Sequence, residues 1–401
     1  MEESRLARLL TILTVLITAL AILFLVAGWG LFAEHLLVGG VALGAWLRWP
    51  RPSHAEQPEV VTPYILSVVA LLVLNAFRLA AHYPAFLTRA YPALFTGQFP
   101  LDPTTWFLLY VCAPVSLLLL GGYFLSRFTV LGYFFAWWGF VYGVVEALIQ
   151  FKLELGGLLG YAHHYFGGVV TAMGLFYLAT TGVLRLSKPA RATSKPGQAL
   201  PPLTDKEVNL WSALFVGLVI VYAATLYTEA GLLPVGVIAG SMMGGLIGWR
   251  KTTARYPADP YQVVPLYLLL QALFYFHVGE EALTGFNRQI AAISGVPWRD
   301  QDFMFFIAFA GPVIWVYAAY SLWVRQHFGN VILWFLLVGM IVGEPTHLVV
   351  FPVARMVQQG VGYEYFSGMY TALFPMVPAI LALVVILKSH RARHRALGDA
   401  G

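Results

Sequence analysis

Twelve apolar runs, each long enough to cross or nearly cross the hydrocarbon core of a bilayer, follow one another along the 401-residue chain. That core is about 30 Å thick, which a helix of about 20 residues spans. The chain is 59% hydrophobic and only 11% charged, more apolar than a soluble core requires. The runs therefore predict an all-α polytopic membrane protein with about twelve transmembrane helices. We place them at residues 7–30, 33–49, 60–82, 104–126, 128–151, 164–186, 207–229, 231–249, 261–283, 302–324, 328–352 and 365–388.

One polar stretch divides these runs into two groups of six. The segment 187–206, SKPARATSKPGQALPPLTDK, is rich in Pro, Ser and Lys, a composition typical of linkers. We therefore expect a first six-helix domain at 1–186, a cytoplasmic linker at 187–206, a second six-helix domain at 207–390 and a basic cytoplasmic tail at 391–401.

The two halves resemble each other at an offset of about 200 residues. YFGGVVTA at 165–172 matches YFSGMYTA at 365–372, and with a small shift Glu146 aligns with Glu344. These matches predict a tandem duplication. Because each repeat has an even number of helices, the two repeats are expected to be parallel, related by an axis along the membrane normal.

The distribution of basic residues predicts the orientation. If the N-terminus is cytoplasmic, most Lys and Arg fall on the cytoplasmic side, as the positive-inside rule requires. We expect an integral protein of a prokaryotic cytoplasmic membrane with both termini in the cytoplasm. Its single cysteine, Cys112, excludes internal disulfides and cysteine metal cages. No nucleic-acid patch is present, so the expected partners are membrane lipid and a hydrophobic small molecule.

Two runs of the second half carry ionisable side chains where such groups are costly and usually functional. His277, Glu280 and Glu281 lie three and four residues apart, so they project from one side of a helix. Glu344 and His347, three apart, share a side of another helix, where Pro345 predicts a kink. In the expected topology all of these groups converge near the outer face.

Three interpretations of this cluster follow from the residues. All five side chains could bind Zn²⁺ or iron, because helix bundles build metal sites from His and Glu at helical spacing. Glu280, Glu281, His277 and Glu344 could instead transfer protons without a metal. The third interpretation is a solvated interface with no chemistry. Asn287, Asp302 and Tyr365 lie close enough along the chain to contact a substrate.

The first half retains little of the cluster. Aligned on the repeat, His277 corresponds to Arg78, Glu281 to His82 and His347 to Ile149. This half is expected to be a scaffold, with at most a smaller polar site. The candidate residues of that site are His82, Glu146, His163 and His164.

The second half resembles the bacterial membrane family named for its HXXEE motif. The resemblance covers residues 270–385 and rests on ordered elements: His277-Val-Gly-Glu280-Glu281, Gly285-Phe286, His347, Tyr365-Phe-Ser-Gly368-Met-Tyr-Thr371 and Pro378. It implies an architecture and a site but no reaction. Glu344 departs from the family pattern, where a neutral polar residue is expected, and this favours an added ligand or proton carrier.

More distantly, the same half is similar to the EXPERA domain of emopamil-binding proteins, which are sterol isomerases and related sterol-binding proteins. The elements are His277 with Glu281, Gly311-Pro312, and Thr371-Ala-Leu-Phe374 with Pro378. The resemblance implies that Thr371 and Phe374 bind substrate. They replace an Asn and a Trp of the family, which puts sterol isomerisation itself in doubt.

We therefore expect a membrane enzyme that acts on a lipid or isoprenoid through the His/Glu site. The chemistry is isomerisation by proton transfer or a metal-assisted reaction. The alternative is a transporter or lipid-binding protein, which would place ionisable residues near the midplane and use both halves.

Overall fold

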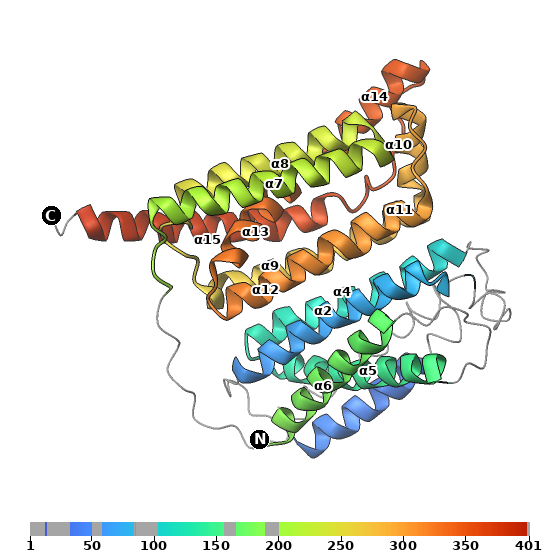
Figure 1. The fold of residues 1–401 in the computed structure, drawn as a ribbon, viewed down its shortest axis with the longest axis vertical. Coiled ribbons are helices and arrows are strands. Elements are labelled where there is room, and N and C mark those ends of the chain that lie inside the picture. The colour runs from blue at the N-terminus through green and yellow to red at the C-terminus, as the bar shows by residue number, and fades with distance from the viewer. Residues whose placement is uncertain are drawn as a thin grey trace. The chain divides into compact units, whose positions relative to one another are not determined.

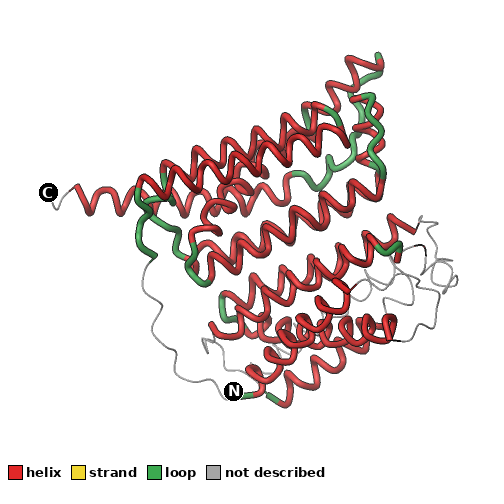
Figure 2. Tube along the Cα trace, viewed as in Figure 1, coloured by secondary structure: helices red, strands yellow, loops and turns green. Residues whose placement is uncertain are grey.

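The computed structural model describes residues 13, 33–49, 58–83, 85, 103–155, 166–188 and 200–398. These ranges are helical and contain no strand (Figure 2). Ten of their helices are long and apolar enough to cross a membrane, and the predicted all-α class is confirmed. The first apolar run, His163, His164 and most of the linker lie outside the described residues.

The chain separates into two compact units, Met1–Ser194 and Lys195–Gly401. In the first unit, α6 packs against α2 and α5, and α4 packs against α5. Its helices are a helix over residues 33–48, α2 (Pro58–Ala80), α4 (Pro103–Ser126), α5 (Val130–Leu155) and α6 (Phe166–Ser187).

In the second unit, α8 packs against α7 and α13, while α9 packs against α12 and α15. The α elements are α7 (Asp205–Ala230), α8 (Leu232–Lys251), α9 (Pro260–Thr284), α10 (Phe286–Ser294), α11 (Asp300–Met304), α12 (Gly311–Trp323), α13 (His327–Val338), α14 (Val350–Gln359) and α15 (Leu373–Gly398). Two π-helical turns, η2 (Phe305–Ala310) and η3 (Gly339–Gly343), and a 3₁₀ turn, η4 (Glu344–His347), interrupt this series.

Local sequence explains where these helices begin and end. Thr204 and Glu207 form a reciprocal capping box at the start of α7. Asp259 accepts a hydrogen bond from the Tyr261 amide at the start of α9, with Pro260 in the first helical turn. Gly285, in a left-handed conformation, ends α9.

The apolar pattern misplaced several elements of the second unit. The predicted helix at 328–352 is broken into α13, η3, η4 and α14, a larger interruption than the kink expected at Pro345. The predicted helix at 365–388 begins only at Leu373, because residues 367–372 form turns around Gly368. α15 then continues to Gly398, so most of the predicted tail is helical.

The short helices α10 and α14 were not predicted. They lie at the same end of the second unit (Figure 1) and contact each other. Both are too short to span a bilayer, and they follow the polar groups at the ends of α9 and η4. α10 and α14 therefore lie at the end of the second unit where α9 and η4 carry their polar residues.

Candidate functional site

Two histidines and two glutamates meet inside the second unit. His277 and Glu281 come from α9, and Glu344 and His347 come from η4. The Glu281 Oε1 atom lies 3.7 Å from His277 Nε2 and 3.5 Å from His347 Nε2. Glu344 Oε2 lies 2.9 Å from His277 Nε2. All four side chains are buried.

The outer ring nitrogens of both histidines are held by hydrogen bonds. His347 Nδ1 lies 2.8 Å from the Ser367 carbonyl oxygen, which can only accept, so Nδ1 carries the proton. His277 Nδ1 lies 2.9 Å from Thr371 Oγ1, and that hydroxyl donates to Glu280 Oε2. The Thr371 hydroxyl oxygen therefore accepts a hydrogen bond from His277 Nδ1–H. In their neutral forms both rings direct the Nε2 lone pair at the carboxylates.

Glu280 points away from this cluster, because adjacent residues on a helix differ in direction by about 100°. Its carboxylate accepts hydrogen bonds from the Tyr365 hydroxyl at 2.6 Å, the Tyr370 amide at 3.1 Å and the Thr371 amide at 2.8 Å. Burial and the bond to Glu280 raise the pKa of Tyr365 to about 12, which keeps this donor protonated. Glu280 fixes the turn at 365–371 and is not among the clustered ligand atoms.

Gly368 brings the backbone of that turn against both imidazoles. Its φ of +87° is strained for any side chain. A Cβ atom built on it would lie 2.5 Å from His347 Nδ1 and 2.8 Å from His277 Cε1. Only glycine can occupy this position with the two rings where they are.

A cavity of about 120 Å³ adjoins the cluster. Its ionisable lining consists of His277, Glu281, Glu344 and His347, Ser241 and Thr346 add hydroxyl groups, and the remainder is largely aromatic or aliphatic. The aromatic walls come from Phe274, Phe286, Trp298, Trp315, Phe335 and Phe351. Charged groups on one wall of an apolar cavity are typical of sites that bind a mostly hydrophobic ligand and act on one polar part of it.

Both π-helical turns contribute to this cavity. Ile307 of η2 and Gly339, Met340 and Gly343 of η3 line it. π-Helical turns inside longer helices frequently mark functional sites. Of the two, η3 immediately precedes Glu344 in the chain.

The donor set fits a single divalent transition metal. One donor atom each from His277, Glu281 and His347 lies within 4.8 Å of the other two. For bonds of about 2.1 Å, ligand atoms are separated by about 3.4 Å in a tetrahedron and about 3.0 Å in an octahedron. The distances from Glu281 Oε1 to His277 Nε2 and His347 Nε2, 3.7 and 3.5 Å, and from Glu344 Oε2 to His277 Nε2, 2.9 Å, bracket these values. The buried His277 Nε2 and Glu344 Oε2 atoms, though close, form no hydrogen bond of acceptable geometry.

The residues expected to contact substrate are not part of the cavity wall. Asn287 donates to the Trp298 carbonyl oxygen at 2.8 Å and to Asp300 Oδ1 at 2.7 Å. Asp302 pairs with Arg299 at 2.5 Å. These two residues therefore brace the connection between α10 and α11.

The other three predicted contacts lie around the turn. Tyr365 and Thr371 belong to the hydrogen bonds that hold Glu280 and His277. Phe374 is 43% exposed and stacks on Phe276 with ring centroids 5.9 Å apart. Its ring therefore lies on the surface of the second unit and does not line the cavity.

Sequence reasoning missed Ser367 and the aromatic walls. Ser367 is fully buried and its carbonyl oxygen orients His347, while its hydroxyl donates to the Glu281 carbonyl oxygen at 3.2 Å. The signal was present, because Ser367 lies inside YFSGMYTA, the segment whose sequence matches residues 165–172. The aromatic residues gave no such signal, since Phe and Trp recur throughout the chain.

In the first unit, the position that the sequence alignment pairs with His277 is Arg78. Arg78 Nη1 lies 2.5 Å from Glu146 Oε2, and both side chains are completely buried. Tyr110 donates to Glu146 Oε1 at 2.7 Å. His82, the position aligned with Glu281, lies beyond the end of α2 and has a φ of +56°. A fixed ion pair occupies this part of the unit.

Comparison with known proteins yields no match: no family model, no curated protein and no solved structure matches the chain. The similarity to the HXXEE and EXPERA families therefore stays a prediction from motifs.

Proposed function

We propose that this protein is an integral membrane enzyme whose second unit holds a divalent metal at His277, Glu281, His347 and Glu344, and acts on a lipid or isoprenoid substrate. The observation that carries the proposal is the cluster itself. Two buried imidazoles, each bonded outward through Nδ1, present Nε2 atoms beside two carboxylates on the wall of an apolar cavity. Metal-binding histidines typically have an outer hydrogen bond of this kind.

Charge balance supports a metal over a metal-free pair. Within the described residues, the ionic contacts of Glu281 and Glu344 are to histidines alone, with no arginine or lysine. Glu146 of the first unit, in contrast, has the permanent cation of Arg78. Buried carboxylates need a compensating charge or a proton. A dication would neutralise both carboxylates while leaving both histidines neutral.

We also infer that the two units derive from one duplicated ancestor. The sequence alignment pairs Arg78 with His277 and Glu146 with Glu344, and each unit contains a buried contact between its two members. Unrelated halves would have no reason to pair these positions. In this proposal the first repeat lost the binding site and kept an ion pair that stabilises its helices.

The cavity limits how much of the substrate can enter. Its volume of about 120 Å³ is well below the ~300–1,000 Å³ of pockets that enclose a drug-sized ligand. We propose that the reacting end of the substrate enters, in contact with Phe274 and Trp315, while its chain remains outside the cavity. The metal would supply a Lewis acid that polarises an oxygen or activates water. Glu344, which lies beside the three-residue ligand group of His277, Glu281 and His347, is the candidate proton carrier.

Metal analysis of the purified full-length protein tests the centre. We expect about one equivalent of Zn or Fe in the wild type, and loss of nearly all of it in His347→Ala. Glu364→Gln is the matched control, since Glu364 is exposed and pairs with Arg355. Less than about a tenth of an equivalent in the wild type would reject the metal and favour proton transfer by the same residues.

Activity is tested separately with a total lipid extract. Wild type and Glu281→Gln are incubated in detergent with the extract, and products are compared by mass spectrometry. We expect one lipid or isoprenoid class to change with the wild type alone. If neither protein changes any class, or both change it equally, the enzymatic proposal fails even if the metal is present.

A further inference from the structure

A second cavity lies at the other end of α9 from the His/Glu cluster. It has a volume of about 460 Å³ and is lined by residues around Asp259, at the start of α9, whereas the cluster begins at His277. Eighteen residues of helix separate them, about 27 Å at a rise of 1.5 Å per residue. The volume lies within the ~300–1,000 Å³ typical of ligand pockets.

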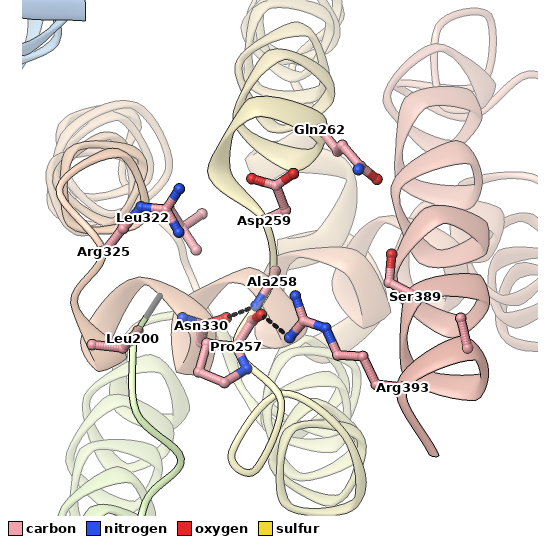
Figure 3. A pocket seen from close by; sticks show the side chains of 11 residues that line it. Leu200, Pro257, Ala258, Asp259, Gln262, Leu322, Arg325, Asn330, Ser389 and Arg393 are labelled. Atoms are coloured by element: carbon pink, nitrogen blue, oxygen red, sulfur yellow. Dashed lines mark hydrogen bonds between the residues drawn. The ribbon is translucent and has the colours of Figure 1, made fainter. Parts of the chain in front are cut away.

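Polar side chains from four parts of the unit converge on this cavity (Figure 3). Arg325 follows α12, Asn330 belongs to α13, and Arg393 reaches in from α15. Asp259, Gln262 and Ser389 complete the polar lining. No element alone forms the site, so the arrangement depends on the folded unit.

Two hydrogen bonds connect residues of the cavity lining. The Ala258 amide donates to Asn330 Oδ1 at 2.9 Å, and Arg393 Nη1 donates to the Pro257 carbonyl oxygen at 3.0 Å. Both bonds are drawn in Figure 3. Arg393 uses one of its five N–H donors in this way, which leaves others for a ligand.

Arg325 is the second arginine of the cavity lining. It is half-buried, its φ of +59° is rare for a residue with a side chain, and within the described residues its guanidinium forms no ion pair. This φ ends α12 in a left-handed cap, where the Arg325 amide donates to the Leu322 carbonyl oxygen and the Gln326 amide donates to the Ser321 carbonyl oxygen. Two arginines against one aspartate give the lining a formal charge of +1.

The position of the cavity favours a lipid as its occupant. It lies where four candidate membrane spans begin or end, at Trp323, His327, Pro260 and Arg393. This is the end of the unit that the basic residues assign to the cytoplasm. Anionic headgroups are attracted to basic sites at that surface. Leu200 and Leu322 add apolar surface beside the arginines.

We propose that this cavity binds the headgroup of an anionic phospholipid of the phosphatidylglycerol type. The phosphodiester is held between Arg325 and Arg393, because guanidinium groups match the geometry and charge of phosphate oxygens. Asp259, Gln262 and Ser389 form hydrogen bonds with the headgroup hydroxyls. The −1 charge of such a headgroup balances the +1 charge of the lining. This site is independent of the metal centre.

Thermal unfolding of the full-length protein in a neutral detergent tests the assignment. Added phosphatidylglycerol is expected to raise the midpoint temperature in a saturable way, since a ligand that binds only the folded state stabilises it. Phosphatidylcholine and free glycerol 3-phosphate, at the same concentrations, are expected to have little effect. An equal effect of glycerol 3-phosphate would overturn the lipid assignment in favour of a soluble phosphate ester.

Variants locate the effect. Arg325→Gln is expected to reduce the apparent affinity for phosphatidylglycerol at least tenfold, and Arg393→Ala likewise. Arg391→Ala, on the same helix as Arg393 but outside the cavity lining, is the matched control and should bind like the wild type. If Arg393→Ala does not fold because it lacks the hydrogen bond to Pro257, the result for Arg325→Gln decides whether the site exists. Unchanged binding by Arg325→Gln, or an equal loss in Arg391→Ala, would contradict the site.

Discussion

Single residues outside the cluster determine its geometry. Gly368 allows the turn at 365–371 to lie against both imidazoles. Ser367 and Thr371, on either side of it, accept hydrogen bonds from the Nδ1–H groups of His347 and His277. Glu280 anchors the same turn. The ligands thus depend on neighbours that never touch a metal.

Replacing Gly368 with alanine should distort the site directly. The positive φ alone costs about 1–3 kcal/mol for a residue with a side chain, and the new Cβ would clash with His347. We expect a lower unfolding temperature and a metal content well below that of the wild type. Gly360→Ala is the control, because its φ is +67° but the added Cβ meets no atom within 4 Å. Equal metal content in both variants would show that the close approach is unimportant.

Replacing Thr371 with valine removes a hydroxyl while keeping the shape. His277 loses its outer acceptor, so we expect metal affinity to fall about 10–100-fold, the usual effect of losing such a partner. Competition with a chelator measures this affinity. Thr228→Val, which removes an exposed hydroxyl bonded within α7, should leave it unchanged. Wild-type affinity in Thr371→Val would argue against the proposed tautomer of His277.

At the level of elements, the break between α13 and α14 places half of the ligands. The π-helical turn η3 is followed by the 3₁₀ turn η4, in which residues three apart lie one above the other. Glu344 and His347 are related in this way, so both face α9. In a continuous α-helix the two side chains would differ in direction by about 60°.

Pro345 contributes to that break, because it lacks an amide hydrogen and its ring opposes a regular helix. Pro345→Ala should allow η4 to regularise, with a loss of metal content of at least half but no loss of thermal stability. Pro378→Ala, within α15 and outside the cavity lining, is the matched control. A parallel fall in stability and metal content in Pro345→Ala would indicate general unfolding instead of a local change.

At the scale of the whole molecule, the two units have different roles in our proposal. The second unit contains the His/Glu cluster and the cavities beside His277 and Asp259, whereas the first contains a buried ion pair between Arg78 and Glu146. A buried pair holds a specific arrangement but is costly to break on one side only.

Removing one partner of that pair tests the division of roles. Arg78→Met should destabilise the protein by about 3–5 kcal/mol, because Glu146 is left buried without its cation. Metal content per folded protein should not change. Thermal unfolding and metal analysis measure the two effects, with the exposed Arg127→Met as control. Loss of metal in Arg78→Met without loss of stability would show that the first unit takes part in the site.

Sequence patterns predicted the helical class, most helix positions and the ligand candidates. Hydrophobic runs determine where helices cross a bilayer, and helical spacing places His277 and Glu281 on one face whatever surrounds them. The same reasoning grouped Glu280 with them, since spacing alone cannot tell which of two adjacent carboxylates faces inward. It also missed α10 and α14, which are short and lack a long apolar run.

The tertiary structure decided how these residues combine. The turn at 365–371, read from the sequence as the start of a helix, takes Glu280 out of the cluster and supplies the outer partners of both histidines. The aromatic walls of the cavity come from segments between Phe274 and Phe351. Contacts over such separations depend on the packing of whole helices, which no local pattern records, whereas the tendency of each run to form a helix is a property of the run itself.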